Sequence, residues 1–273
     1  MIVKYALALV AALALSAPAI AADDISASTI PAIGSSIIAA IRAQGIPTAV
    51  VSNDTGHLWS WEGPGGAVMR AITDDDGTIR MIDVRKDGES VAVNVKPVLH
   101  ILLGQTTLTQ IDNALHSDAD YTAPGWLPDH SAKAEVLSFR TSRMRELVLF
   151  FNAAGRAVQE LVYGERGMVA RAGLLPGASD ATQMLVYHAP VLRKGGVVEY
   201  PHTSASGTTI LKLAIDKHGA VSEVTLFVSS GDPALDDAAK KAAMKEVYTP
   251  AQLAGKPVDA IVFRDERFIV RKR

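Results

Sequence analysis

Histidine and acidic residues are the side chains of this sequence that could carry chemistry. Two histidines four residues apart on a helix would offer both rings to one zinc ion, and no pair here has that spacing. We therefore predict no metal site, and a surface or turn position for each of the histidines, which are His57, His100, His116, His130, His188, His202 and His218.

Other short motifs with catalytic or binding potential lack an essential part. The acidic run Asp74–Asp76, followed by Gly77, lacks the distal glutamate of a calcium loop and predicts a hairpin turn. The glycine-rich segment 63–66 lacks the Lys-Ser/Thr pair that holds phosphate, and no Gly-x-Ser-x-Gly elbow occurs. Trp59 and Trp61 share one face of a predicted strand, which favours core packing over a carbohydrate or peptide platform. The sequence predicts no catalytic residues and no cofactor.

Composition narrows the class of protein further. The chain has 273 residues, 48% of them apolar, which is enough for packed cores in two or three domains. A formal net charge of −2 shows no excess of basic residues of the kind that binds nucleic acid. The absence of cysteine excludes disulfides, thiolate metal sites, a cysteine nucleophile and a lipoprotein anchor.

The N-terminus is typical of an export signal. Lys4 precedes an apolar run over residues 5–17, and Ala19-Ile20-Ala21 forms a small-x-small cleavage pattern. We expect a signal peptide over residues 1–22 and an exported, periplasmic protein. The alternative is an uncleaved inner-membrane anchor with the rest of the chain on the periplasmic side, although a spanning helix needs about 20 apolar residues.

Two segments with the same order of elements follow the signal. In residues 23–97, apolar residues at helical spacing up to residue 44 precede short strands at 49–51, 58–61, 68–73 and 78–84. In residues 98–175, a short helix over 108–115 precedes strands at 135–140, 145–152 and 157–163. The sequence therefore predicts an α+β fold that begins with two small units, each a helix followed by an antiparallel meander. Internal duplication is one explanation of this pattern.

Residues 190–273 show the most specific pattern. Strands are predicted at 208–215 and 220–228, joined by a turn at Gly219. A helix follows from Ser230 or Asp232 to about Val247, and the last strand covers 259–270. Ala239, Ala242, Ala243 and Val247 would form the helix face that packs on the sheet.

This C-terminal segment resembles the TonB C-terminal family. The motifs that carry the resemblance run in order from Tyr200-Pro201 through the hairpin 216–224, the helix start 229–236 and the stop 248–251 to Gly255-Lys256-Pro257-Val258. The resemblance implies a β-β-α-β domain. Residues 102–164 weakly resemble the small α+β domains of the SmpA/OmlA type, through Leu103-Gly104-Gln105-Thr106, the helix after it and the final hairpin.

The TonB resemblance implies a function in protein binding. Domains of that family pair an exposed sheet edge with an extended segment of an outer-membrane transporter, which is strand addition. The expected edge is the last strand, with the partner-binding residues Val258, Ala260, Val262, Arg264 and Phe268. A non-enzymatic periplasmic binding module is the first hypothesis. The alternatives are an anchored TonB-like energy transducer, and a ligand-binding or hydrolytic domain with a TonB-type appendage. The sequence leaves the oligomeric state open.

Overall fold

The structure is a computed structural model of the chain. It describes residues 30–53, 56–63, 67–85, 90–93, 99–115, 119–128, 131–152, 157–175, 185–201, 203 and 205–269. The expected signal peptide lies outside these residues. In the described part of the chain, no helix is both long and apolar enough to cross a membrane.

The first part of the chain is a helix followed by four antiparallel strands. Ser36 caps the helix by accepting a hydrogen bond from the amide of Ile38, and Gly45 ends it with a φ of 83°. The helix is shorter than the apolar pattern suggested, because residues 33 and 34 form a turn before it. The elements are α2 (Ile37–Gln44), β1 (Ala49–Asn53), β2 (Gly56–Glu62), β3 (Val68–Thr73) and β4 (Ile79–Arg85).

The second part repeats this order after a short two-stranded ribbon. The ribbon pairs Val91 with Ile101, and the strands that follow the helix again form an antiparallel meander. Its elements are β5 (Ser90–Val93), β6 (Leu99–Leu102), α3 (Leu108–Leu115), β7 (Tyr121–Trp126), β8 (Lys133–Ser142), β9 (Arg145–Asn152), β10 (Val158–Glu165) and α4 (Arg166–Arg171).

The C-terminal part contains the expected two strands, helix and final strand, together with several short strands. Gly219 turns the first hairpin with a φ of 87°, and Asp232 caps the helix by accepting from the amide of Ala234 at 2.7 Å. The elements are β11 (Tyr187–His188), β12 (Val191–Lys194), β13 (Gly207–Ile215), β14 (Val221–Val228), α5 (Pro233–Ala243), β15 (Val247–Thr249), β16 (Ala251–Leu253), β17 (Lys256–Val258) and β18 (Ala260–Phe268).

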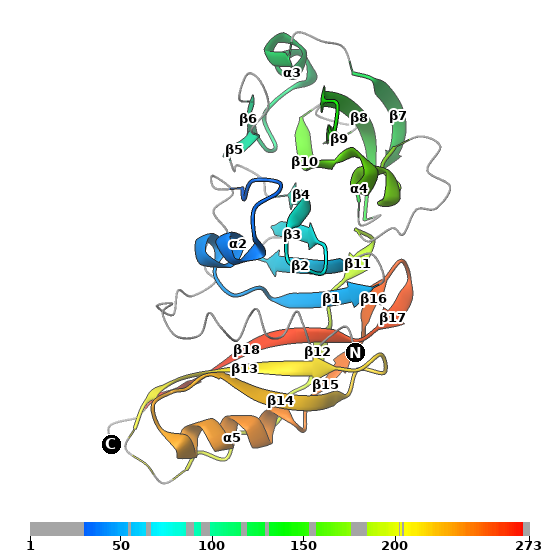
Figure 1. Cartoon of the computed structure of the whole chain (residues 1–273). Coiled ribbons are helices and arrows are strands. Elements are labelled where there is room, and N and C mark those ends of the chain that lie inside the picture. The colour runs from blue at the N-terminus through cyan, green and yellow to red at the C-terminus, as the bar shows by residue number, and fades with distance from the viewer. Residues whose placement is uncertain are drawn as a thin grey trace.

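One sheet of eleven strands connects all three parts. Its order is β14-β13-β18-β1-β2-β3-β4-β10-β9-β8-β7, so the C-terminal strands continue the sheet of the first two parts (Figure 1). The chain therefore does not divide into separate sheets at the expected boundaries 97 and 175. The outer strands of this sheet are β14 and β7.

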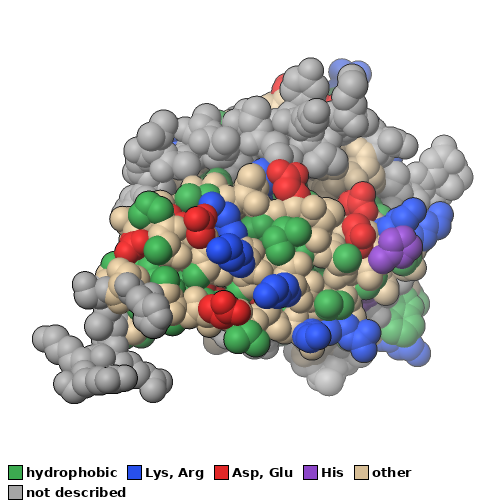
Figure 2. Space-filling view, turned by 90° about the horizontal axis from the view of Figure 1, so that it is seen from below, with side chains coloured by type: hydrophobic (Ala, Val, Ile, Leu, Met, Phe, Trp, Pro, Cys, Tyr) green, Lys and Arg blue, Asp and Glu red, His purple; other side chains and the backbone are tan. Residues whose placement is uncertain are grey.

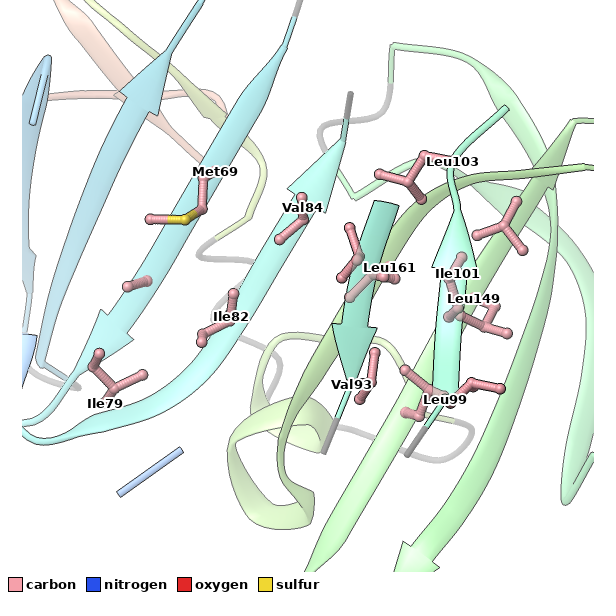
Figure 3. Packing of buried hydrophobic residues seen from close by; sticks show 14 of the residues in the cluster. Met69, Ile79, Ile82, Val84, Val93, Leu99, Ile101, Leu103, Leu149 and Leu161 are labelled. Carbon is pink, nitrogen blue, oxygen red and sulfur yellow. The ribbon is translucent and has the colours of Figure 1, made fainter. Parts of the chain in front are cut away.

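Three apolar clusters cover the two faces of this sheet. The largest lies where α2, α3 and the β5–β6 ribbon pack on one face, and Figure 3 shows side chains of β3, β4, β9 and β10 meeting those of the ribbon. The opposite face carries a second cluster with α4 and the β16 residues Ala251 and Leu253. A third cluster lies between α5 and β13. Trp59 and Trp61 are buried in the first cluster, as core packing requires.

The C-terminal helix ends earlier than the sequence pattern suggested. Ala239, Ala242 and Ala243 are buried against the sheet, as expected, but α5 ends at Ala243. Val247 lies in β15 instead and is exposed, so its expected place on the packed face is wrong. The reason is tertiary, since Val247 forms a bridge to Ala220 and the neighbouring Glu246 is buried beside Arg264.

Candidate partner-binding strand

The last strand, β18, lies inside the sheet and not at its edge. It pairs with β13 over its full length, from Ala260 opposite Ile215 to Phe268 opposite Gly207. On its other side β1 pairs with it, Ala49 opposite Val262 and Val50 opposite Ile261. The expectation of an exposed edge along the whole strand is therefore wrong. Strand pairing between residues 49–50 and 261–262 follows from how the sheet assembles, and no local pattern predicts it.

The five expected contact residues fall in different environments. Val258 belongs to β17 and pairs with Ala251, so it is not part of the last strand. Ala260 and Val262 lie beside the β1 segment, and both belong to or pack against apolar clusters. Arg264 and Phe268 lie beyond the β1 pairing. The structure thus places two of the five, Arg264 and Phe268, on a part of β18 that β1 leaves uncovered.

This uncovered part is residues 264–268, which we call the open segment. The amide of Phe263 donates a hydrogen bond to the carbonyl oxygen of Thr48 at 3.3 Å. No strand among the described residues pairs with residues 264–268 on this side, because their pairs all belong to β13. Five residues of extended chain provide room for a short added strand.

Alternation along the strand identifies the backbone groups that face this open side. The N–H and C=O of one residue in an antiparallel strand point to the same neighbour, and those of the next residue point to the other. Since the amide of Phe263 points toward β1, the amides and carbonyls of Asp265 and Arg267 face the open side. Those of Arg264, Glu266 and Phe268 face β13. The open segment thus offers two donors and two acceptors to an added strand.

Side chains fix the open segment from the α5 face. The Arg264 guanidinium contacts Glu246 at 2.5 Å and Glu266 at 2.8 Å. The Tyr248 hydroxyl donates to Glu246 at 2.7 Å, and burial first, then this carboxylate, raises the pKa of Tyr248 well above its ordinary value. Phe268 is buried, and its ring meets Tyr200 edge-on at 5.5 Å. The strand is therefore held rigidly, which lowers the entropic cost of binding a partner strand.

The exposed side chains of the open segment carry opposite charges. Asp265 and Arg267 are exposed, and Glu266 is half-buried. A groove of about 410 Å³ lies at its end, lined by Ser206, Gly207, Thr208, Arg267, Phe268 and Ile269. Charges on an unpaired strand protect it against aggregation and also select the side chains of a partner. Figure 2 views the C-terminal part from the side of α5 and shows charged and hydrophobic side chains mixed over that face.

A second cavity, of about 430 Å³, lies at the other end of the contact between β1 and β18. Polar groups on its wall include Ser52, Asp216, Lys217, Ser222 and Asp259. Sequence reasoning missed this site, because its residues come from strands that pair only in the folded sheet.

Ser52 also contacts His57, which is buried in β2, so the surface or turn position expected for this histidine is wrong. The distance from its Oγ to Nδ1 of His57 is 2.6 Å, and the residues are directly opposite on β1 and β2. Nε2 of His57 lies 3.8 Å from Asp75. Burial lowers the pKa of His57 below 6.5, although Asp75 and Asp74 oppose this shift. A neutral imidazole beside a hydroxyl can act as a base.

Metal-binding residues do not come together in the described ranges. No group of three or more His, Asp or Glu side chains there could hold an ion. The acidic run forms the hairpin turn that the sequence predicted, because Gly77 has a φ of 80° and the Thr78 amide donates to Asp74 and Asp76. His116, His130 and His202 lie outside the described residues.

Comparison with known families identifies the C-terminal part of the chain. Residues 199–268 match the family model described as Gram-negative bacterial TonB protein C-terminal. These residues form a TonB C-terminal domain. Within this TonB-type domain lie β13, β14, α5 and β18, the strands and helix that the sequence resemblance implied. The match does not extend to residues 1–198, so the resemblance of 102–164 to SmpA/OmlA-type domains stays a prediction. No curated protein matches the chain.

Solved structures give only distant similarity. A DUF4309 family protein of Bacillus subtilis is 16% identical, over 48% of this chain and 79% of its own, with a TM-score of 0.33. A cysteine-rich secretory protein of Staphylococcus aureus is 15% identical, over 55% and 50%, with a TM-score of 0.39. An extracellular SCP-domain protein of Bacillus anthracis is 9% identical, over 56% and 49%, with a TM-score of 0.36. This chain thus spans about half the length of the last two.

Proposed function

We propose that this protein is a non-enzymatic binding module of the periplasm that captures an extended protein segment by strand addition. TonB-family domains interact with proteins such as outer-membrane transporters. The observation that carries the proposal is the open segment of β18. There, the backbone groups of Asp265 and Arg267 pair with no strand among the residues that the structure describes. Main-chain hydrogen bonds there would supply affinity, and alternate side chains would supply specificity.

The position of β1 limits where a partner strand could lie and how long it could be. A partner strand would lie in line with β1 and continue it beyond Thr48. It would pair with about five residues, so it would be short, and it would meet the exposed charges of Asp265 and Arg267. We infer that the N-terminal extended segment of an outer-membrane, TonB-dependent transporter is such a partner.

Site-specific photocrosslinking in the host tests this proposal. A photoreactive phenylalanine analogue replaces Arg267 in the open segment, and in a matched control it replaces Thr225 in β14, an outer strand at the same end of the sheet. The proposal predicts that Arg267 crosslinks to the N-terminal segment of a transporter and that Thr225 does not. Equal labelling at the two positions, or an adduct from Thr225 alone, would contradict it.

Energy transduction is an alternative role for a TonB-type domain. It requires the N-terminal apolar segment to remain as an inner-membrane anchor, and that segment lies outside the described residues. The N-terminal mass of the protein from the envelope fraction separates the two roles. A start at Ala22 or Asp23 supports a free periplasmic module, whereas an intact Met1 in the inner membrane supports the transducer.

Hydrolysis is a second candidate function, which the Ser52–His57 pair beside the 430 Å³ cavity favours. In this scheme Ser52 Oγ attacks an ester carbonyl while its proton passes to His57 Nδ1. His57 then protonates the departing alcohol, and water releases the acyl group. A fluorophosphonate probe would label Ser52 in the intact chain and not in Ser52→Ala. Ser222→Ala is the matched control, because Ser222 lines the same cavity but bonds the carbonyl of Ala214.

We infer that the segments 23–97 and 98–175 are two α+β units that support the TonB-type domain. Each contributes four strands to the same sheet, β1–β4 from the first and β7–β10 from the second. Their fixed contact with β18 through β1 would position the open segment. Deletion of the first unit should therefore leave β18 unpaired along one full side, which limited proteolysis of the truncated chain would show.

A further inference from the structure

Exposed hydrophobic side chains gather at one place on the TonB-type domain and the strand before it. Among the described residues, ten large hydrophobic side chains are exposed, and five of them lie in two short segments. These are Val191, Leu192, Val197, Met244 and Val247, with exposed fractions from 43% to 80%. Single exposed apolar residues are ordinary, but a cluster of this kind marks a surface for interaction.

Two contacts hold the two segments together. Strand β12 pairs with β15, so that Leu192 lies opposite Tyr248 and Lys194 opposite Val247. Gly196 lies against the last turn of α5, where a Cβ would come within 1.9 Å of the carbonyl oxygen of Ala242. Tyr248 is buried and bonded to Glu246, which leaves Val247 between them on the outside. The cluster is therefore a fixed surface.

Basic side chains lie next to these apolar residues along both segments. Arg193 and Lys194 belong to β12, and Lys241 and Lys245 lie at the end of α5. All four are exposed, and none takes part in an ion pair within the described part of the chain. The nearest exposed acids along the chain are Glu199 after β12 and Asp237 in α5, and Asp237 pairs with Lys240. The surface thus combines exposed apolar side chains with an excess of positive charge.

We propose that this basic apolar surface docks the protein on an anionic lipid membrane. Valine, leucine and methionine side chains can enter the boundary between headgroups and acyl chains, while lysine and arginine reach the phosphates. A second copy of the chain fits poorly, because two such surfaces would bring like charges together. The surface shares no residue with the two cavities described above.

Flotation with lipid vesicles tests the proposal, using the chain purified from the host envelope. The probes are vesicles of phosphatidylcholine alone and of phosphatidylcholine with an equal part of phosphatidylglycerol. The chain should float with the anionic vesicles and not with the neutral ones. Each cation near such a surface contributes about fivefold in affinity, so Lys194→Gln with Lys245→Gln should weaken binding roughly 20-fold.

Matched variants separate this surface from general charge. Arg140→Gln with Arg143→Gln removes the same charge near β8, toward the other end of the sheet, and should leave binding unchanged. Val197→Ser with Val191→Ser should weaken the binding that remains at high salt. The N-terminal segment is common to all variants, so differences report the surface alone. Equal binding of the two double charge variants, or no flotation of the unaltered chain at low salt, would overturn the proposal.

Discussion

The amide of Phe263 donates to the carbonyl oxygen of Thr48 at 3.3 Å, and the pairing of β18 with β1 goes no further toward the C-terminus. This bond marks where the strand changes from an interior to an open position. The first residues of β18 pair on both sides, and no strand in the described part of the chain pairs with the second side of residues 264–268. The same strand therefore anchors the TonB-type domain to the preceding units and offers a site for a partner.

Proline substitutions distinguish the two sides of the open segment. Asp265→Pro removes an amide that faces the open side and should change the free energy of unfolding by less than about 1 kcal/mol. Glu266→Pro removes an amide that bonds β13 and should cost about 3 kcal/mol. Urea denaturation of both variants measures the difference. Similar losses would mean that Asp265 is also bonded within the protein.

Two buried carboxyl groups predict an unusual dependence of stability on pH. Glu160 and Asp83 are both buried, and within the described part of the chain Glu160 Oε1 and Asp83 Oδ1 have no hydrogen-bond partner. Burial, followed by the charge of Asp83, raises the pKa of Glu160 well above 4.5, against the opposing charges of Arg85 and Arg70. A protonated Glu160 can donate a hydrogen bond to Asp83, so Glu160 binds its proton more tightly in the folded state.

The sign of the effect follows from this proton. The folded chain holds it more tightly than the unfolded chain, so stability is highest below the ordinary pKa and falls as pH rises through the raised value. Glu160→Gln keeps a donor without titrating and should flatten this dependence. Urea midpoints measured across the acid to neutral range test it, and an unchanged slope in the variant would refute the assignment to Glu160.

Asp236 should contribute to stability much more than its neighbour Asp237. Burial disfavours its charged form, but hydrogen bonds from Ser229, Ser230 and Thr209 outweigh burial and lower its pKa below 3.8. Asp236→Asn should cost about 1–3 kcal/mol at neutral pH. This advantage of the unaltered chain should disappear as pH falls below the ordinary pKa of an aspartate. Asp237→Asn, at an exposed position, should stay within about 0.5 kcal/mol in the same denaturation experiment.

Two glycines with positive φ should respond differently to alanine. A Cβ on Gly219 would lie 2.0 Å from the carbonyl oxygen of Tyr248, whereas Gly255 has open space around it. Both variants suffer strain of about 1 kcal/mol from the backbone. Gly219→Ala must also displace β15, so it should lower the melting temperature clearly more than Gly255→Ala does. Equal melting temperatures would show that β15 moves freely away from the hairpin.

Much of the local structure could be predicted from the sequence. Asp232 caps α5, Gly219 forms the hairpin and Trp59 is buried, because each of these roles depends on neighbouring residues or on alternation along one strand. The short strands β12 and β15 were not predicted. They have three or four residues each, too few for a periodic pattern, and their pairing joins residues 191–194 to 247–249.

The candidate site was predicted only in part, because it too depends on pairing between distant segments. The alternating residues of β18 indicated a strand, but its edge position depends on whether β1 pairs with it. That pairing is set by the burial of Ala49 and Ala260 on one face and of Val50 and Ile261 on the other. These contacts join distant parts of the chain, and periodicity along one segment carries no information about them.

Residue-specific amide exchange of β18 tests the central claim most directly. In the free chain, the amides of Asp265 and Arg267 should exchange quickly, while those of Arg264 and Glu266 should be protected by β13. Addition of the N-terminal segment of a TonB-dependent transporter from the same host should slow Asp265 and Arg267 selectively. Protection of these two amides in the free chain, or no change when the segment is added in excess, would contradict strand addition at this site.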